Sequence, residues 1–387
     1  MGTTQTAIYL IANADTWMED SAIEQLKRTA QLPGMTAVAG MPDLHPGRGY
    51  PVGAAFQSQD IFYPALVGND IGCGMALHQL DLPKQKWGGV KLAEKLGNID
   101  GPLDDAFQDA IDHAKMTNHP HVRALGTIGG GNHFAEIQQV DKIFVDQEEL
   151  ALHAPWLDVK KLQLLVHSGS RGLGEEILRH HVDQYGHTGL THGSPEAQAY
   201  MQQHDAALEF ARLNRQFIAE RILKRLRTTA VQGLDIHHNY VERIIQDKTV
   251  QYLHRKGATP ANQGIVMIPG SRGDYSYLVK PLPSEKSLYS LAHGAGRKWM
   301  RSDCIGKLGS RVRFDDLVKT SLGSTVVCND AKLMFEEAPQ AYKAIDSVVA
   351  SMQEAGLMIT LARFKPLMTY KTSTSRNSAR KGCPSCL

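Results

Sequence analysis

The feature that most constrains the fold of this chain is a series of short apolar runs, each ending in glycine or a polar side chain. Three of them span residues 66–67, 164–166 and 265–268. Short apolar runs that stop at turn residues are typical of buried strands. Helical patterns lie between them, without the regular strand and helix alternation of a doubly wound sheet. The sequence therefore predicts an α+β fold in which mixed β-sheets are surrounded by helices.

The chain is long enough for one large core or two smaller ones. Its 387 residues exceed the common domain size of about 100–150 residues, but no linker-like segment or repeat divides it before its end. We therefore predict one domain over residues 1–371 and a polar tail over residues 372–387. The tail pair Cys383 and Cys386 has no second metal-ligand pair beside it. Inside the domain we expect a buried strand over 7–11, a helix over 194–226, and a second helix starting near 337–339.

Composition excludes several classes of protein. With 42% hydrophobic residues and a formal charge of +2, the chain is neither disordered nor able to hold nucleic acid by bulk charge. Five scattered cysteines form no disulfide framework, and no apolar run reaches the roughly 20 residues of a membrane span. We therefore expect a cytoplasmic protein with no membrane partner. Its seventeen histidines indicate metal or proton chemistry.

Metal-type side chains lie among glycines in four separate segments. These side chains are Asp70, Cys73, His133, His167 and His238. Together they form a borderline-soft ligand set that suits two divalent transition ions, with the thiolate able to bridge them. The set is larger than a single tetrahedral structural site needs. Two neighbouring metal ions are a recurrent solution for in-line displacement at phosphorus.

A further segment, residues 292–301, differs in kind. His293 is followed by glycine, and three cations lie within the next eight residues. A neutral imidazole can attack phosphorus and form a phosphohistidine when the phosphate charge is neutralised. Arg171, Arg297 and Arg301 are candidate phosphate donors for that task.

Seven motifs occur in the order seen in RtcB-type RNA ligases, so the chain resembles that family. They span residues 69–75, 129–136, 167–172, 237–241, 269–273, 293–297 and 337–343. With a further match at 41–47 and the ending at Lys371, the resemblance covers nearly the whole chain. The short length and the segment 363–371 resemble the bacterial branch associated with peptide release factor H.

The resemblance implies a ligase, dependent on GTP and two Mn²⁺, that joins RNA 3′-phosphate or 2′,3′-cyclic phosphate ends to 5′-hydroxyl ends. Cys73 would bridge the metals, with Asp70 and His133 at one and His167 and His238 at the other. His293 would become guanylylated. The nucleotide would be bound by Asp43, Asn132, Glu136, Ser271, Ser276, His293, Gly294, Gly296, Arg297, Tyr342 and Lys371. RNA or GTP phosphates would be held by Arg171, Arg297 and Arg301.

The resemblance also implies partners: RNA with broken ends (tRNA, rRNA or mRNA), an activating archease, or a functional link to release factor H. His45 and His237 are expected beside the site. Arg272 departs from the pattern, because the family commonly has Met there, next to Ser271. Two alternatives stay open. A two-metal phosphoesterase or cyclic phosphodiesterase would need the metal ligands but not His293, and a non-catalytic protein that binds RNA ends or a translation factor would keep them for structure.

Overall fold

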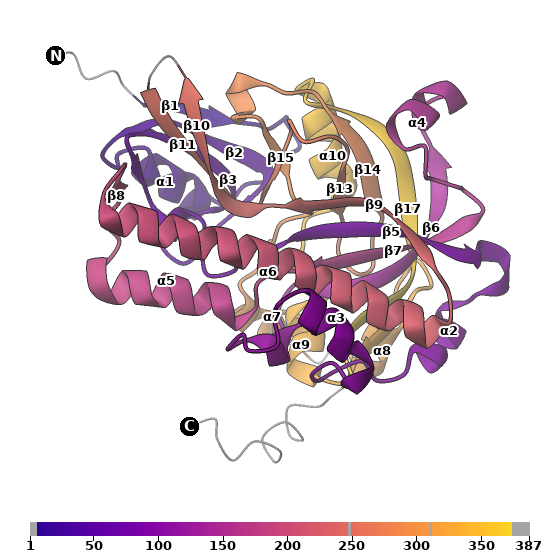
Figure 1. Cartoon of the computed structure of the whole chain (residues 1–387). Helices are drawn as coiled ribbons and strands as arrows, with labels where there is room; N and C mark the ends of the chain where they lie inside the picture. Colours follow the sequence, from indigo (N-terminus) through magenta and orange to yellow (C-terminus); the bar gives the residue numbers. More distant parts are fainter. Residues whose placement is uncertain (1–5, 247–248, 310–311, 374–387) are drawn as a thin grey trace.

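The computed structural model describes residues 6–246, 249–309 and 312–373, and two larger sheets form its frame (Figure 1). The first sheet has five strands in the order β1-β2-β3-β11-β10. Their bounds are β1 Ala7–Leu10, β2 Met35–His45, β3 Val52–Gln59, β10 Asn239–Gln246 and β11 Thr249–Lys256. Strand β1 runs parallel to β2, and the other neighbours in this sheet are antiparallel.

The second sheet is larger and follows the order β13-β14-β17-β6-β7-β5-β9, with β16 paired in parallel to β17. Its strands are β5 Gly74–Pro83, β6 Phe134–Ile143, β7 Lys161–Ser168, β9 Ala230–His237, β13 Val266–Pro269, β14 Ser276–Pro281, β16 Thr325–Cys328 and β17 Met358–Thr372. Two short pairs complete the described strands: β4 Ile61–Phe62 with β8 Leu190–Thr191, and β12 Ala258–Pro260 with β15 Ser290–Ala292.

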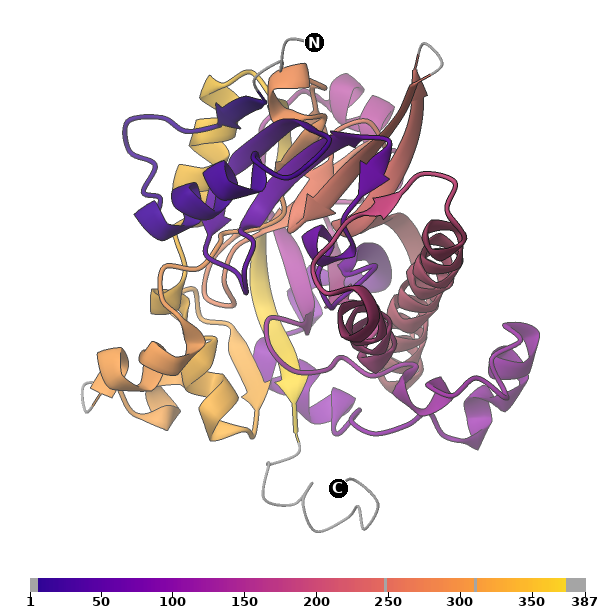
Figure 2. The same ribbon diagram turned by 90° about the vertical axis from the view of Figure 1, so that its left-hand side faces the viewer.

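Helices surround these sheets, which confirms the α+β prediction. They are α1 Asp20–Thr29, α2 Gly89–Leu96, α3 Gln108–His113, α4 Gln147–His153, α5 Gly172–Tyr185, α6 Pro195–Leu226, α7 Arg301–Leu308, α8 Phe314–Val318, α9 Ala331–Glu336 and α10 Ile345–Glu354. Figure 2 shows α5 and α6 on one side of the molecule and α7 to α9 on the other. Within the described ranges, no helix is long and apolar enough to span a membrane.

The long helix α6 follows from local sequence signals. Ser194 caps it by accepting a hydrogen bond from the Ala197 backbone N–H at 3.1 Å, and proline occupies the first helical position. Its buried residues Ile218 and Ile222 pack with Leu164 of β7 in one apolar cluster. The predicted helix over 194–226 is confirmed, and it covers one face of the larger sheet.

Three local predictions are wrong. Residues 66–67 form no strand, because Pro64 starts a 3₁₀ turn, Pro64–Leu66, and Val67 is the residue that caps its end. The second helix α10 begins at Ile345, after a 3₁₀ turn over Pro339–Ala341. Strand β1 is half-buried at a sheet edge, and Ile8 and Leu10 are 45% and 43% exposed. The division of the chain at residue 371 stays a prediction, and Cys383 and Cys386 lie outside the described residues.

The two sheets meet at the point where the polar segments gather. Gly74, at the start of β5, pairs with both Ser168 and His237, which end β7 and β9. The first residue of β6 pairs with His167. Because β9 ends at His237 and β10 begins at Asn239, His238 lies at the junction between the sheets. Strand ends from both sheets thus bring the predicted site residues together.

Candidate active site

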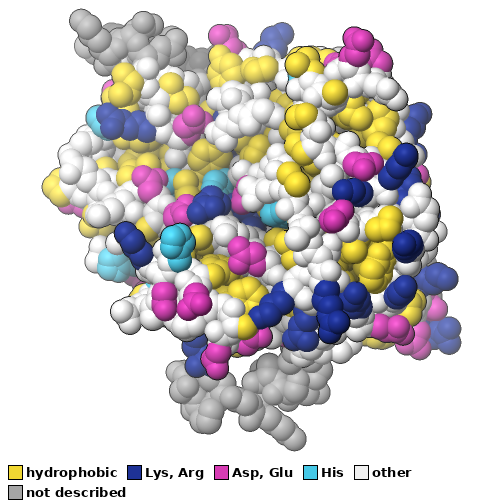
Figure 3. All heavy atoms as spheres, turned by 45° about the vertical axis from the view of Figure 1, so that its right-hand side comes forward, with side chains coloured by type: hydrophobic (Ala, Val, Ile, Leu, Met, Phe, Trp, Pro, Cys, Tyr) yellow, Lys and Arg dark blue, Asp and Glu magenta, His cyan; other side chains and the backbone are white. Residues whose placement is uncertain are grey.

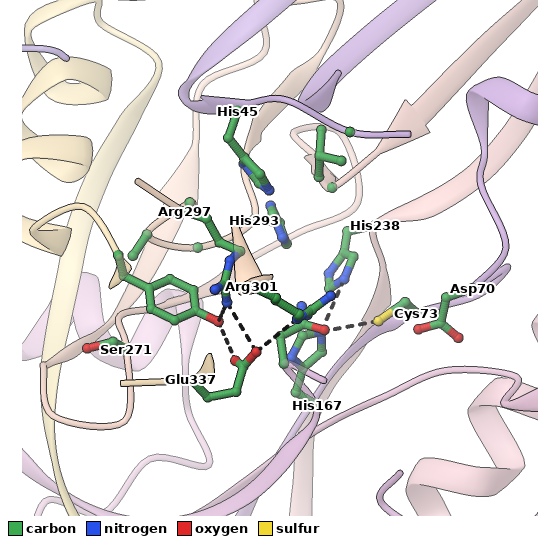
Figure 4. A pocket seen from close by; sticks show the side chains of 18 of the residues that line it. His45, Asp70, Cys73, His167, His238, Ser271, His293, Arg297, Arg301 and Glu337 are labelled. Atoms are coloured by element: carbon green, nitrogen blue, oxygen red, sulfur yellow. Dashed lines mark hydrogen bonds and ion pairs between the residues drawn. The ribbon is translucent and has the colours of Figure 1, made fainter. Parts of the chain in front are cut away.

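Five metal-type donor atoms form a continuous chain with a sulfur atom at its centre, and Figure 4 shows the side chains of four of the residues, Asp70, Cys73, His167 and His238. On one side of Cys73 Sγ, His133 Nε2 lies at 3.3 Å and is itself 2.7 Å from Asp70 Oδ2. On the other side, His167 Nε2 lies at 3.1 Å and is 3.3 Å from His238 Nε2. We call these five residues the donor side. The sequence predicted this set, and the structure brings all five members together.

Backbone contacts and one arginine hold the segments of the donor side in register. The Cys73 carbonyl accepts a hydrogen bond from the His238 backbone N–H at 2.8 Å. Arg215, fully buried on α6, donates to the carbonyls of Gly72 at 2.8 Å and Ser168 at 3.0 Å. It also forms an ion pair with Asp235. Arg215 was not predicted from the sequence. The available signal was a charged residue between Ala211 and Ile218 on the apolar face of a helix, because a buried charge needs fixed partners.

The glycine at position 169 is required by close packing. A Cβ atom there would lie 2.2 Å from Asp70 Oδ1, so any other residue would displace that carboxylate. This contact explains why the His-Ser-Gly segment can lie directly against the Asn-Asp segment of the donor side.

The chemistry of the donor side fits divalent transition metals. Burial, together with neighbouring histidines, lowers the pKa of His167 and His238 well below the ordinary value, so both rings are neutral and offer lone pairs. Burial and the Asp70 carboxylate raise the pKa of the Cys73 thiol. A cation between these atoms would supply the missing counter-charge and deprotonate the thiol. Two donors lie on each side of the sulfur, so Asp70, Cys73, His133, His167 and His238 are the residues that would hold such cations.

His293 lies beside the donor side but is held by a carboxylate. Asp43 is fully buried on β2, and its Oδ2 accepts hydrogen bonds from His293 Nδ1 at 2.7 Å and from the His293 backbone N–H at 3.2 Å. The proton on Nδ1 leaves a lone pair on Nε2. The His293 ring centroid is 4.8 Å from that of His238. Gly296 has φ +69, and a Cβ there would lie 2.3 Å from the Asp43 carbonyl, so glycine permits this approach.

A cavity of about 650 Å³ joins these groups and contains most of the predicted residues. Those lining it are Asp70, Cys73, Asn132, His167, His238, Ser271, His293, Gly294, Gly296, Arg297, Arg301, Tyr342 and Lys371. His133 and Asp43 lie behind the wall, in contact with Cys73 and His293. Arg171 packs over Gly129 and donates to the Thr127 hydroxyl at 3.3 Å, outside the cavity lining. His45 lines the cavity, whereas His237 contacts the Gly72 carbonyl at 2.8 Å.

Glu136 and Ser276 lie behind the cavity wall and are connected through Gln138. The Gln138 amide donates to Glu136 Oε1 at 2.6 Å and to the Ser276 hydroxyl at 2.9 Å. Thr369, which does line the cavity, donates to Glu136 Oε2. Burial raises the pKa of Glu136 to about 7 despite these hydrogen bonds. Thr369 and Gln138 are contacts that the sequence did not reveal.

The other end of the cavity is a group of cations around one carboxylate, Glu337. We call Arg272, Arg297, Arg301, Glu337 and Lys371 the cation side. Glu337 Oε1 accepts from Arg297 at 3.1 Å and Arg301 at 3.2 Å, and Lys371 Nζ lies 3.8 Å from Oε2. Burial alone would raise the pKa of Glu337, but Lys371 and the two arginines hold it below the ordinary value.

Arg297 and Arg301 differ in how many donors they have already used. Every nitrogen of Arg297 has a partner within the protein: Trp299 O, Glu337 Oε1, the Tyr342 hydroxyl, Cys304 Sγ and Glu336 O. Arg301 donates to Glu337 through Nε, and its side chain is 46% exposed. Arg301 is therefore the better placed of the two to contact a phosphate. Glu337 was overlooked in the sequence, although it begins the matched motif at 337–343.

Comparisons with known proteins show the family of this chain. A family model described as tRNA-splicing ligase RtcB matches residues 25–102 and 92–372. RNA-splicing ligase RtcB2 of Escherichia coli is 52% identical over 367 residues, covering 95% of this chain and 96% of that protein. The tRNA-splicing ligase RtcB of Thermococcus kodakarensis is 29% identical over 449 residues, covering 91% of each. Placement in the branch associated with release factor H stays a prediction. With matches of this extent, the chain belongs to the RtcB ligase family.

Proposed function

We propose that this protein is a GTP-dependent RNA ligase that joins 3′-phosphate or 2′,3′-cyclic phosphate ends to 5′-hydroxyl ends through a guanylylated His293. One observation carries the proposal. His293 has its Nδ1 fixed by Asp43 and its Nε2 outside the donor chain, in a cavity bounded by metal-type donors on one side and cations on the other. A phosphoesterase would need the donor side but not this oriented imidazole.

The pair formed by Asp43 and His293 is suited to nucleophilic attack on phosphorus. The Asp43 carboxylate accepts the Nδ1 proton, so the Nε2 lone pair is available and the positive charge that develops on the ring is stabilised. In the first step Nε2 forms a bond to the α-phosphorus of GTP, and the bond to pyrophosphate breaks. The guanylyl group then passes from Nε2 to the RNA 3′-phosphate.

In the last step the 5′-hydroxyl of the second RNA end attacks the activated 3′-phosphate. The new phosphodiester forms as GMP leaves, and the hydroxyl proton is released. Two Mn²⁺ ions held by the donor side would polarise phosphate oxygens and supply the activated water that opens a cyclic phosphate. Asp70, Cys73, His133, His167 and His238 are the residues that would hold them.

The cation side is suited to the nucleotide and to RNA phosphates. Arg301 and Lys371 border the cavity, with Ser271 and Tyr342 beside them. Because every step brings anions together, fixed cations near the reacting phosphates lower the electrostatic cost. The relatives' names point to RNA as substrate, and for the archaeal relative to tRNA. The archease and release factor H partners stay predictions.

The test is transfer of label from α-labelled GTP to the protein in the presence of Mn²⁺. We expect an acid-labile, alkali-stable label on the wild type and none on His293→Ala. A control with γ-labelled GTP should give no labelled protein, because pyrophosphate leaves. Opening of a cyclic phosphate without protein label would instead favour the phosphodiesterase, and RNA binding without either reaction would favour the binding protein.

A further inference from the structure

Arg272 is a buried arginine with unused donors. It lies in the turn between β13 and β14, directly after Ser271, and lines the same cavity while being only 7% exposed. Its Nη2 donates to the Met334 carbonyl at 2.9 Å. Its Nε and Nη1 have no hydrogen-bond partner in the part of the chain that the structure describes.

The other buried arginines show how unusual this is. Among the described residues, Arg215 and Arg255 are paired with carboxylates at 2.6 Å and 2.8 Å. Arg221 donates to four backbone carbonyls, which belong to Ile99, Gly101, Pro102 and Gly126. Leaving a buried donor unpaired is unfavourable, and more so when the donor is charged. A ligand that enters the cavity would supply the acceptors that Arg272 lacks.

The position of Arg272 in the cavity determines which part of a bound ligand Arg272 can contact. Figure 4 shows Ser271 and Asp70 on opposite sides of His293. If the α-phosphate lies at His293 and the other phosphates face the donor side, the nucleoside extends toward Ser271. Arg272 is adjacent to Ser271. The ionisable groups that interact electrostatically with its guanidinium are Cys328, Glu337, Tyr342 and Lys371, and none of them belongs to the donor side. A nucleobase, and not a phosphate, would then reach its unused donors.

We propose that Arg272 donates hydrogen bonds to the O6 and N7 acceptors of guanine and so selects GTP over ATP. Arginine is the side chain that most often recognises this edge of guanine. Adenine places an amino group at position 6, so its donor would face the donors of Arg272. The inference deepens the proposed function and depends on it.

Equilibrium binding tests the inference without turnover. In a His293→Ala background, binding of GTP, ATP and 7-deaza-GTP is measured by calorimetric titration, with Arg272→Met compared with the unchanged residue. We expect Arg272→Met to weaken GTP binding by about ten- to a hundredfold and ATP binding by much less. The analogue 7-deaza-GTP lacks N7, so it should bind more weakly than GTP only when Arg272 is present.

Arg301→Met is the matched control, because it removes an arginine from the same cavity. It should weaken GTP and ATP binding equally and leave the penalty for 7-deaza-GTP unchanged. Equal loss of GTP and ATP in Arg272→Met would assign Arg272 to a phosphate and overturn the inference. An unchanged GTP affinity, or the same 7-deaza-GTP penalty with and without Arg272, would also overturn it.

Two further measurements separate the inference from folding and from the proposed function. If Arg272→Met does not fold, Arg272→Lys, which keeps the charge but loses the guanidinium geometry, is expected to lose part of the preference for GTP over ATP. A Lys variant with full preference would contradict the inference. If the protein with His293 takes no label from GTP, the proposed function fails, whereas labelling by GTP and ATP at equal efficiency contradicts only the role of Arg272.

Discussion

The two sides of the cavity differ in the kind of polar group that they present to a ligand. The donor side is a cluster of three imidazoles, one thiol and one carboxylate, in which burial keeps His167 and His238 uncharged. The cation side gathers three arginines and Lys371 around Glu337, a single carboxylate. One side thus has an excess of lone pairs and the other an excess of N–H donors.

This difference indicates which ligand each side complements. Lone pairs converging on a sulfur atom attract divalent cations, whereas buried guanidinium groups attract anions and carbonyl acceptors. His293 lies between them, so a phosphate at its Nε2 can be approached from both sides. We expect substitutions on the donor side to abolish chemistry and those on the cation side to alter binding or stability.

The largest effect is expected from Cys73→Ala. Loss of the central donor should lower Mn²⁺ affinity by more than about a hundredfold, since even second-shell changes cost about 10–100-fold. Guanylylation should fall below detection for the same reason. Bound Mn²⁺ after dialysis and incorporation of α-label from GTP measure the two quantities.

Cys304→Ala is the matched control for that substitution. Cys304 is also fully buried, but its sulfur accepts from Arg297 on the cation side at 3.3 Å. Its loss should leave Mn²⁺ binding intact. If both variants lose the metal equally, the distinction between the two sides is wrong.

The donor side was predictable because its residues lie in four short segments at strand ends, three of which contain glycine. Asp70 and Cys73 are three residues apart, and His167 directly follows a clear apolar run. The helix α6 was predictable for a similar reason, because its cap and its apolar pattern are local. Features that a short segment encodes by itself can be recognised before any tertiary contact is known.

The cation side was less predictable because its contacts join distant residues. Glu337 meets Arg297 across 40 positions of the chain, and no local pattern distinguishes an arginine that has used all its donors from one that has not. The same reason explains the misplaced start of α10. Pro339 is a good first-turn residue, but the chain straightens at Tyr342, which pairs with Arg297 in an isolated bridge.

Arg297 and Arg301 both donate to Glu337, but their loss should have different effects. Arg297→Met should lower the free energy of unfolding by about 3–5 kcal/mol, because it breaks a buried ion pair and leaves Glu337 with fewer partners. Arg301→Met should leave stability nearly unchanged, because this side chain is 46% exposed. It should instead raise the KM for GTP about tenfold through loss of a charged hydrogen bond.

Urea unfolding and initial rates of guanylylation separate these two outcomes. Glu337→Gln is the third variant, since it keeps the shape of the side chain and removes the shared charge. We expect it to resemble Arg297→Met in stability. If Arg301→Met were the more destabilised arginine variant, the assignment of a structural role to Arg297 would fail.

The smallest effect concerns pH and Glu136. Its pKa is raised to about 7 by burial, and Lys371 on the adjacent strand is the charged group that opposes this shift. The raised pKa means that the folded protein binds this proton more tightly than the unfolded chain does. The carboxyl therefore stabilises the fold at pH values below its ordinary pKa of 4.5, and this contribution is lost as the pH rises through about 7. Glu136 is predicted to bind the nucleotide, and only its ionised carboxylate is free of a proton and can accept from two N–H groups, so GTP affinity should instead rise over the same upper range. In Glu136→Gln both dependences should flatten, and affinity for GTP measured at pH 6 and pH 8 should differ by less than in the wild type. An unchanged pH profile in that variant would show that the titrating group lies elsewhere, so the comparison of the two sides would have to include it.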